Sequence, residues 1–205
     1  MIHAHAPAFI PLAAMWLGMM AVMMGPTVWP WILAFDRVGG SGAGRAARTA
    51  ASAVFAGGYL AAWLIYAVAA AGLQMTLARA GTFDAAGSLA PAAGALVLAA
   101  AGLYQFAPLK HACLMHCRNP LSFFLARWHG GAGGSFRMGF GHGLFCVGCC
   151  WALMATSLAV GVMSLWWMAV VTAVAFAEQV APWGERLRVP AGIALLAGAI
   201  VRLWW

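Results

Sequence analysis

Long uncharged hydrophobic runs alternate along the chain with short segments rich in arginine, glycine and proline. A run of roughly 20 apolar residues is long enough to cross the hydrocarbon core of a bilayer as a helix. The runs show almost no strict alternation of apolar and polar residues, which favours helices over the strands of a membrane β-barrel. The pattern therefore predicts an all-α, polytopic transmembrane bundle with about six spans. The expected spans cover residues 9–35, 49–73, 89–109, 136–162, 164–180 and 190–205.

A shorter element is expected between the third and fourth spans. Asn119 suits the N-cap of a helix and Pro120 suits its first position. Apolar residues then recur on one face, so we expect a short helix over residues 120–129 that lies in the membrane surface. The glycine-rich residues 130–135 are expected to act as a hinge before the next span.

Composition supports the membrane class. The chain is 65% hydrophobic and only 7% charged, whereas a soluble domain carries about 25% charged residues. We therefore expect one integral membrane domain over residues 1–205, in contact with the lipid bilayer. The net charge of +7 is explained by loop arginines, and no basic tract interleaved with aromatic residues points to nucleic acid.

The basic residues also predict an orientation, because cytoplasmic loops of membrane proteins are enriched in lysine and arginine. One set of loops holds Arg37, Arg45, Arg48, Lys110, Arg118, Arg127, Arg137, Arg186 and Arg188. The other set holds Arg79 and Arg202. This bias predicts a protein of the bacterial inner membrane with both termini outside. No basic region precedes the first span, so an uncleaved anchor is expected, and His3 and His5 on the free terminus are given no role.

All five cysteines fall in two clusters that also contain histidine. The clusters comprise His111, Cys113, His116 and Cys117, and then His142, Cys146, Cys149 and Cys150. An odd number of cysteines gathered near one membrane face differs from the even, dispersed pattern of a disulfide framework. The clusters therefore favour metal ligands, although a free cysteine can also be a small buried hydrophobic residue.

Helical spacing brings many of these groups onto shared faces. Within the fourth span, positions three and four apart carry Met138, His142, Cys146, Cys149, Cys150 and Met154. Thiolate and imidazole together suit Cu(I) or Zn(II), and thioethers favour Cu(I) over zinc. We expect copper, with zinc as the alternative and with Met19, Met23, Met138 and Met154 as secondary ligands. The competing interpretation is that these methionines fill gaps in apolar packing.

The number of metal sites depends on how deep each histidine and cysteine lies in the membrane and on the polar residues nearby. Along its helix, Cys150 lies about 20 Å from Arg137, which is past the middle of a ~30 Å hydrocarbon core. If Lys110 marks the surface, His142 is expected to reach the first cluster, whereas Cys149 and Cys150 are expected to lie too deep. One site, two sites or a line of transfer positions therefore remain open. The groups expected to orient or neutralise the site are Glu178, Lys110 and Gln105, and Glu178 alternatively pairs with Lys110 or Arg186.

Residues 16–26, 103–120 and 141–151 resemble a bacterial family of predicted metal-binding integral membrane proteins, domain of unknown function 2182. The resemblance covers nearly the whole chain and its two His/Cys motifs. It implies metal binding by the eight histidines and cysteines of the two clusters, and the family is sometimes described as a copper chaperone. Gly25 stands where the methionine motif leads us to expect leucine, a departure that concerns packing.

Three functions remain open. The leading hypothesis is copper handling as a carrier, chaperone-like factor or transporter component, with a metal-delivering or metal-receiving protein as partner. The second is a membrane metalloenzyme that uses the metal for redox chemistry, which needs an open coordination position. The third is a thiol–disulfide protein using Cys149 and Cys150, which is disfavoured because vicinal disulfides are strained and the cytoplasmic side is reducing. The pattern favours a non-enzymatic role and indicates no oligomeric state.

Overall fold

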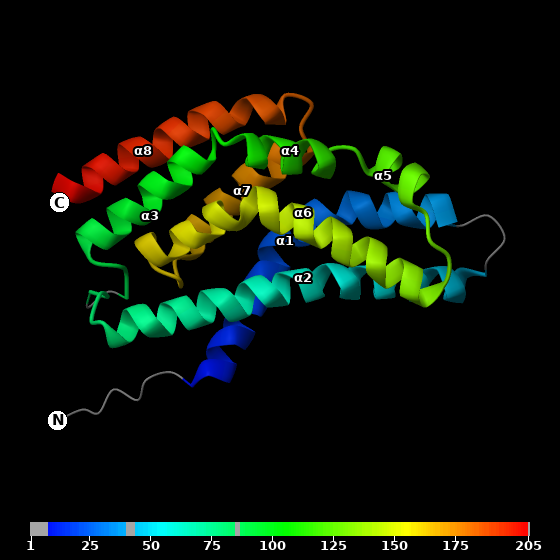
Figure 1. The fold of residues 1–205 in the computed structure, drawn as a ribbon, viewed down its shortest axis with the longest axis horizontal. Helices are drawn as coiled ribbons and strands as arrows, with labels where there is room; N and C mark the ends of the chain where they lie inside the picture. Colours follow the sequence, from blue (N-terminus) through cyan, green and yellow to red (C-terminus); the bar gives the residue numbers. More distant parts are fainter. Residues whose placement is uncertain (1–7, 40–43, 85–86, 205) are drawn as a thin grey trace.

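The computed structural model describes residues 8–39, 44–84 and 87–204 (Figure 1). His3 and His5 lie outside the described residues. The elements are α1 (Phe9–Gly39), α2 (Arg45–Arg79), α3 (Pro91–Tyr104), α4 (Pro108–Cys117), α5 (Pro120–Arg127), α6 (Gly131–Val160), α7 (Leu165–Val180), the 3₁₀ helix η1 (Gly184–Leu187) and α8 (Arg188–Trp204). Apart from an isolated bridge between Phe83 and Leu89, the regular structure of these residues is helical, which confirms the all-α class.

Helix α6 lies at the centre of an elongated bundle and packs most extensively against α2, with α3, α4 and α7 as further neighbours (Figure 1). Glycines permit the close approach of α2 and α6. A Cβ at Gly139 would collide with the carbonyl oxygen of Phe55, and a Cβ at Gly58 would collide with that of Phe136. Small residues spaced in this way allow helix backbones to pack directly against each other in membranes. The contact fixes the α6 cysteines relative to α2.

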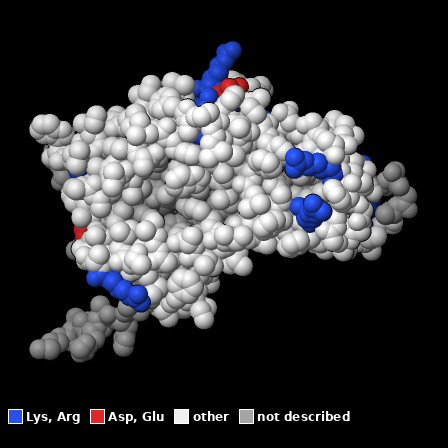
Figure 2. Space-filling view, viewed as in Figure 1, with Lys and Arg blue, Asp and Glu red and all other residues white. Residues whose placement is uncertain are grey.

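Four helical segments are long and apolar enough to cross a membrane: α1, α2, α6 and Gly184–Trp204. The pair α3 and α4 forms a fifth candidate, bent by 66°, and α7 is shorter. The face shown in Figure 2 is largely uncharged, and large apolar side chains such as Leu165 and Trp166 are 79% and 80% exposed. The structure therefore supports a membrane protein with four or five candidate spans among its described residues, and the expected count of six is not confirmed.

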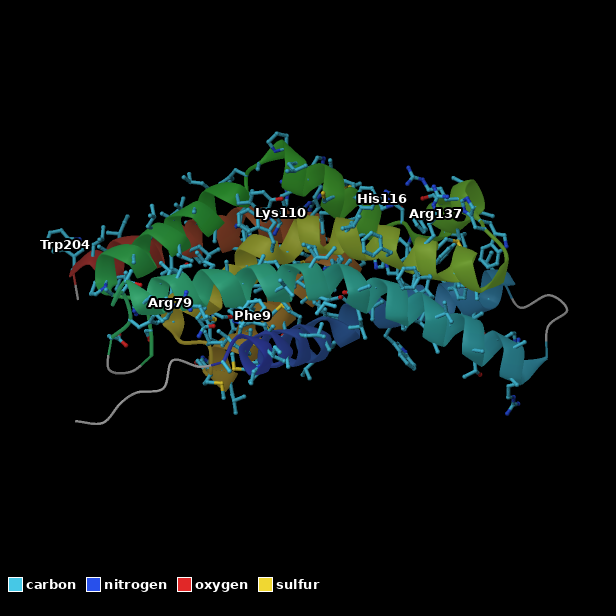
Figure 3. All side chains as sticks on the ribbon, turned by 60° about the horizontal axis from the view of Figure 1, so that its bottom comes forward. Phe9, Arg79, Lys110, His116, Arg137 and Trp204 are labelled. Atoms are coloured by element: carbon cyan, nitrogen blue, oxygen red, sulfur yellow. The ribbon has the colours of Figure 1, made fainter. Side chains whose placement is uncertain are left out.

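The third expected span is broken. Helix α3 ends at Tyr104, and Pro108 begins α4. Proline disfavours a helical conformation at the residue before it, and Ala107 is accordingly extended, with φ −64° and ψ 138°. The bend lays α4 against α6. Lys110, which we expected to mark the surface, is 0% exposed and lies between the ends of the molecule marked by Arg79 and Arg137 in Figure 3.

Two expected loops are largely helical. Of residues 130–135, expected to be a hinge, Gly130 is extended and precedes α6, and residues 131–135 form the start of α6, where Gly131 has a φ of +77°. Residues 36–48 are shared between the end of α1 and the start of α2, so this connection is much shorter than predicted. Helix α5 falls within the range expected for a short helix, and its location at a membrane surface stays a prediction.

Candidate metal centre

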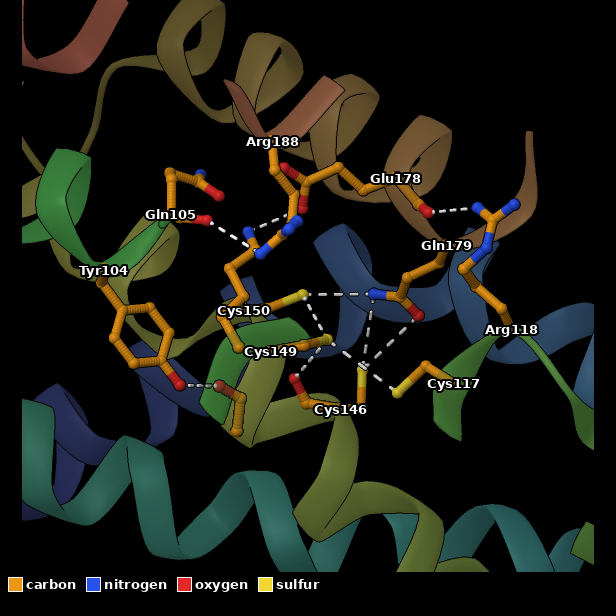
Figure 4. A network of polar contacts seen from close by, with 12 residues as sticks. Tyr104, Gln105, Cys117, Arg118, Cys146, Cys149, Cys150, Glu178, Gln179 and Arg188 are labelled. Atoms are coloured by element: carbon orange, nitrogen blue, oxygen red, sulfur yellow. Dashed lines mark hydrogen bonds and ion pairs between the residues drawn. The ribbon is translucent and has the colours of Figure 1, made fainter. Parts of the chain in front are cut away.

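Three cysteine side chains of α6 converge at the centre of the bundle (Figure 4). The Sγ atoms of Cys146, Cys149 and Cys150 all lie within 4.8 Å of one another. Their spacing places them on one face of the helix, and each side chain is at most 1% exposed. Three of the six residues in the stripe predicted from the sequence therefore form a compact group of donors.

A fourth thiol comes from α4. The Sγ atom of Cys117 lies 3.9 Å from that of Cys149, which in turn lies 3.3 Å from that of Cys150. Two sulfur atoms that bind one ion through bonds of about 2.3 Å lie at most about 4.6 Å apart. Both separations satisfy this condition, and Cys117 adjoins the three α6 thiols at Cys149 without belonging to the group whose sulfur atoms all lie within 4.8 Å of one another. Thiol donors of this kind suit copper or zinc. All five cysteines are free thiols.

Gln179 and Tyr59 also contact the thiols, and neither was predicted from the sequence to belong to the site. The side-chain amide of Gln179, on α7, donates to Cys150 Sγ at 3.1 Å and lies 3.8 Å from Cys146 Sγ. The Tyr59 hydroxyl, on α2, shares a 3.2 Å hydrogen bond with Cys146 Sγ. A buried amide in an apolar helix and a buried tyrosine both require polar partners, which is the signal that could have identified them.

A buried ion pair holds α4 against α7 beside the thiols. Lys110 Nζ lies 2.7 Å from Glu178 Oε2, with the two side chains 0% and 1% exposed. Arg118 adds a 2.6 Å hydrogen bond to the backbone carbonyl of Glu178. The structure thus adopts the alternative in which Glu178 pairs with Lys110, and Glu178 does not orient a histidine. Because Gln179 follows Glu178 directly, the pair also positions the Gln179 amide.

Gln105 was expected beside the site and instead lies at the break between α3 and α4. Its backbone carbonyl accepts a 3.2 Å hydrogen bond from Arg188 (Figure 4). Both polar atoms of its side chain are buried without a partner among the described residues. Gln105 therefore secures the contact of α8 with the break.

His142 and His116 lie outside the thiol group. The His142 ring stacks on Trp31 with centroids 3.6 Å apart, and it is 0% exposed. Neither of its ring nitrogens has a hydrogen-bond partner among the described residues. The His116 ring stacks on Phe145 at 3.7 Å, and its Nε2 atom is likewise buried and unpartnered. Both imidazoles therefore stack on aromatic rings outside the thiol group.

His111 and Cys113 are not part of the thiol group. His111 is half-buried beside Glu185, with Nδ1 and Oε1 3.3 Å apart. Cys113 packs against α6 at Gly148, where a Cβ would lie 2.8 Å from its Sγ atom. The eight expected ligands therefore do not form one site. The depth expectation is also wrong, because the bend before α4 brings Cys117 to Cys149.

The four methionines expected as secondary ligands are all buried: Met19, Met23, Met138 and Met154. Met23 lines a groove between α1 and α7. Met138 lines a cavity between α5 and the first turns of α6. Met138 thus lies both on the thiol-bearing face of α6 and beside a cavity.

The fold and the site define an all-helical protein whose apolar helices enclose a group of soft metal donors. A family model, PpoB2, described as a copper chaperone, matches residues 13–202, and the chain belongs to this family. No curated protein and no solved structure matches the chain. The match does not name domain of unknown function 2182, so that resemblance stays a prediction.

Proposed function

We propose that this protein is an integral membrane copper chaperone that holds Cu(I) at the thiol group formed by Cys117, Cys146, Cys149 and Cys150. The observation that carries the proposal is the convergence of these buried thiols from α4 and α6 in a chain of a copper chaperone family. His142, His116 and Met138 serve transfer of the ion, while His111 and Cys113 lie outside the site.

The donor set supports Cu(I) over harder ions. Thiolate sulfur is soft and favours Cu(I), although zinc also accepts cysteine ligands. A thiolate in an apolar interior is costly unless a cation compensates it. The thiols therefore stay protonated until the metal arrives, and binding releases protons. The Gln179 amide and the Tyr59 hydroxyl then stabilise the bound sulfur atoms by hydrogen bonds.

For the membrane arrangement we propose six crossings, with α3 and α4 together forming one broken span and α7 a short one. The 16 residues of α7 extend about 24 Å, so local thinning of the bilayer compensates a modest mismatch. This arrangement places both termini outside, the connection between α1 and α2 in the cytoplasm and the protein in the bacterial inner membrane. Irregular backbone at the α3–α4 break is tolerated because protein surrounds it.

The burial of the four thiols favours a chaperone over a metalloenzyme, and their oxidation state distinguishes a chaperone from a thiol–disulfide protein. A metalloenzyme needs an open coordination position and a pocket beside the metal, whereas each of the four thiols is at most 2% exposed. A thiol–disulfide protein would use the 3.3 Å approach of Cys149 and Cys150, and a disulfide in the purified protein would support it. A chaperone also implies a metal-receiving protein as partner.

Metal analysis of the purified protein tests the proposal. After anaerobic loading with Cu(I), we expect about one copper per chain, lost in Cys117→Ser and in Cys149→Ser. Cys113→Ser provides the matched control, because this buried cysteine lies on the same helix as Cys117 but outside the group, and it should retain copper. Equal retention in all three variants, or zinc bound in preference to copper, contradicts the proposed site.

A further inference from the structure

The four thiols are enclosed, so copper reaches them only through the protein. A cavity of about 430 Å³ lies between α5 and the first turns of α6. It is lined by Phe123, Arg127, His129, Arg137, Met138, Phe140 and Gly141. Small-molecule sites in proteins typically have volumes of about 300–1,000 Å³, so this cavity has the size for a small ligand.

The cavity is lined by positively charged side chains, whereas an entry site for a free cation is expected to be negatively charged. Arg127, His129 and Arg137 are all exposed, and the lining residues include no carboxylate. Neither arginine takes part in an ion pair among the described residues. In Figure 2, basic side chains lie close together over the end of the molecule that carries α5 and α6. Such a cavity repels Cu(I) alone and attracts carboxylates.

The inner wall of the cavity leads toward the thiols through soft donors. Met138, 2% exposed, lies one helical turn before His142, and His142 lies one turn before Cys146. A second contact leads the same way, because the Phe123 ring packs edge-on against His116 with centroids 5.2 Å apart. The unpartnered nitrogens of His142 and His116 therefore lie between the cavity and the cysteines.

We propose, resting on the proposed function, that this cavity docks Cu(I) as an anionic complex with a small carboxylate-bearing thiol. Arg127 and Arg137 bind the carboxylates of the carrier, and Met138 faces its metal. Copper then passes inward by ligand exchange: each copper–sulfur bond to the carrier breaks as one to a protein cysteine forms. The proton of each cysteine thiol goes to the departing carrier thiolate, so copper stays Cu(I) and no oxidant or reductant is consumed.

The test compares two copper donors with the purified full chain in an uncharged detergent. One donor is the anionic Cu(I)–glutathione complex, and the other is the cationic Cu(I)–acetonitrile complex. In Arg127→Gln/Arg137→Gln we expect loading from glutathione to slow by about tenfold or more and loading from acetonitrile to be unchanged or faster. Salt should slow loading from glutathione in the wild type. The matched control is Arg37→Gln/Arg45→Gln, exposed arginines on α1 and α2 outside this cavity.

Each outcome decides between the two proposals. Final copper content should equal that of the wild type in both double variants, since neither removes a thiol. Equal rates from glutathione in wild type and variant, or equal slowing from both donors, overturn the docking proposal and leave the copper site standing. Failure of the wild type to take up copper from either donor overturns the copper site and the docking proposal with it.

Discussion

Cys117 and Cys149 are 32 positions apart in the chain, and their Sγ atoms are 3.9 Å apart in the structure. The break before Pro108 makes this approach possible, because it lays α4 against α6. The thiol group therefore belongs to two helices, and its geometry depends on the contacts that hold α2, α4 and α7 against α6.

The Gln179 amide is expected to strengthen copper binding. It donates to Cys150 Sγ at 3.1 Å, and such a bond grows stronger when the sulfur becomes a metal-bound thiolate. Gln179→Leu should weaken Cu(I) affinity by about tenfold or more while the number of bound ions stays the same. Competition with a chromophoric Cu(I) chelator measures the affinity. Gln74→Leu is the control, because Gln74 accepts from Trp16 instead, and equal affinities in the two variants would contradict the assigned role.

The buried pair of Lys110 and Glu178 should control stability. Lys110→Met leaves a buried carboxylate unpaired, which costs about 3–5 kcal/mol. The double variant Lys110→Met/Glu178→Leu should recover most of this loss, because it removes both charges. Chemical unfolding of the purified protein in detergent measures the difference. The half-buried pair of Glu185 with His111 gives the control: Glu185→Gln should change stability by less than about 1 kcal/mol.

A double variant as unstable as Lys110→Met alone would rule out this explanation, since the unpaired charge would then not be the cause of the loss.

Close packing of α2 against α6 gives a third prediction. A Cβ at Gly139 would collide with the backbone of Phe55, whereas a Cβ at Gly133 meets no atom within 4 Å. Gly139→Ala should destabilise the protein by about 1–3 kcal/mol and weaken copper binding, since it moves Tyr59 away from Cys146. Gly133→Ala, the matched control on the same helix and outside the cavity, should not destabilise the protein and should leave copper binding unchanged. Thermal unfolding and copper competition check both, and equal effects of the two substitutions would contradict the predicted packing.

The sequence predicted the donors on α6 because helical spacing alone decides which of them share a face. It could not predict which residues other helices bring to that face. Gln179 and Tyr59 reach the thiols through packing between distant segments. Cys113 and Cys117 lie on the same expected face, and the direction of α4 after the break determines that only Cys117 meets Cys149.

The same limit explains the error in depth. Lys110 was expected to mark the membrane surface because lysine in a membrane is costly. Its buried partner Glu178 lies 68 positions further along the chain, and the pair allows both charges to remain in the interior. The position of a residue along one helix does not reveal a partner on another helix, so the depth of Lys110 could not be predicted in this way.

The last prediction concerns His142, which is buried without a hydrogen bond among the described residues. Its substitution should raise the stability of the protein and slow copper loading, so the two effects can be measured separately. His142→Phe keeps a flat ring against Trp31, which stacks on His142 at 3.6 Å, and removes two unpartnered nitrogens. The metal-free protein should gain about 1–3 kcal/mol in stability, the cost of a buried polar group that lacks a partner. Copper loading should slow several-fold while the final copper content is unchanged, because the four thiols remain.

Stopped-flow loading and chemical unfolding measure the two effects on one preparation of His142→Phe. The matched control is His111→Phe, since His111 is half-buried beside Glu185 and lies outside the thiol group; it should alter neither loading nor content. A fall in final copper content would make His142 a permanent ligand of the bound ion. Unchanged loading together with a gain in stability would make it a packing residue, and a loss of stability would show that an unseen partner satisfies its nitrogens.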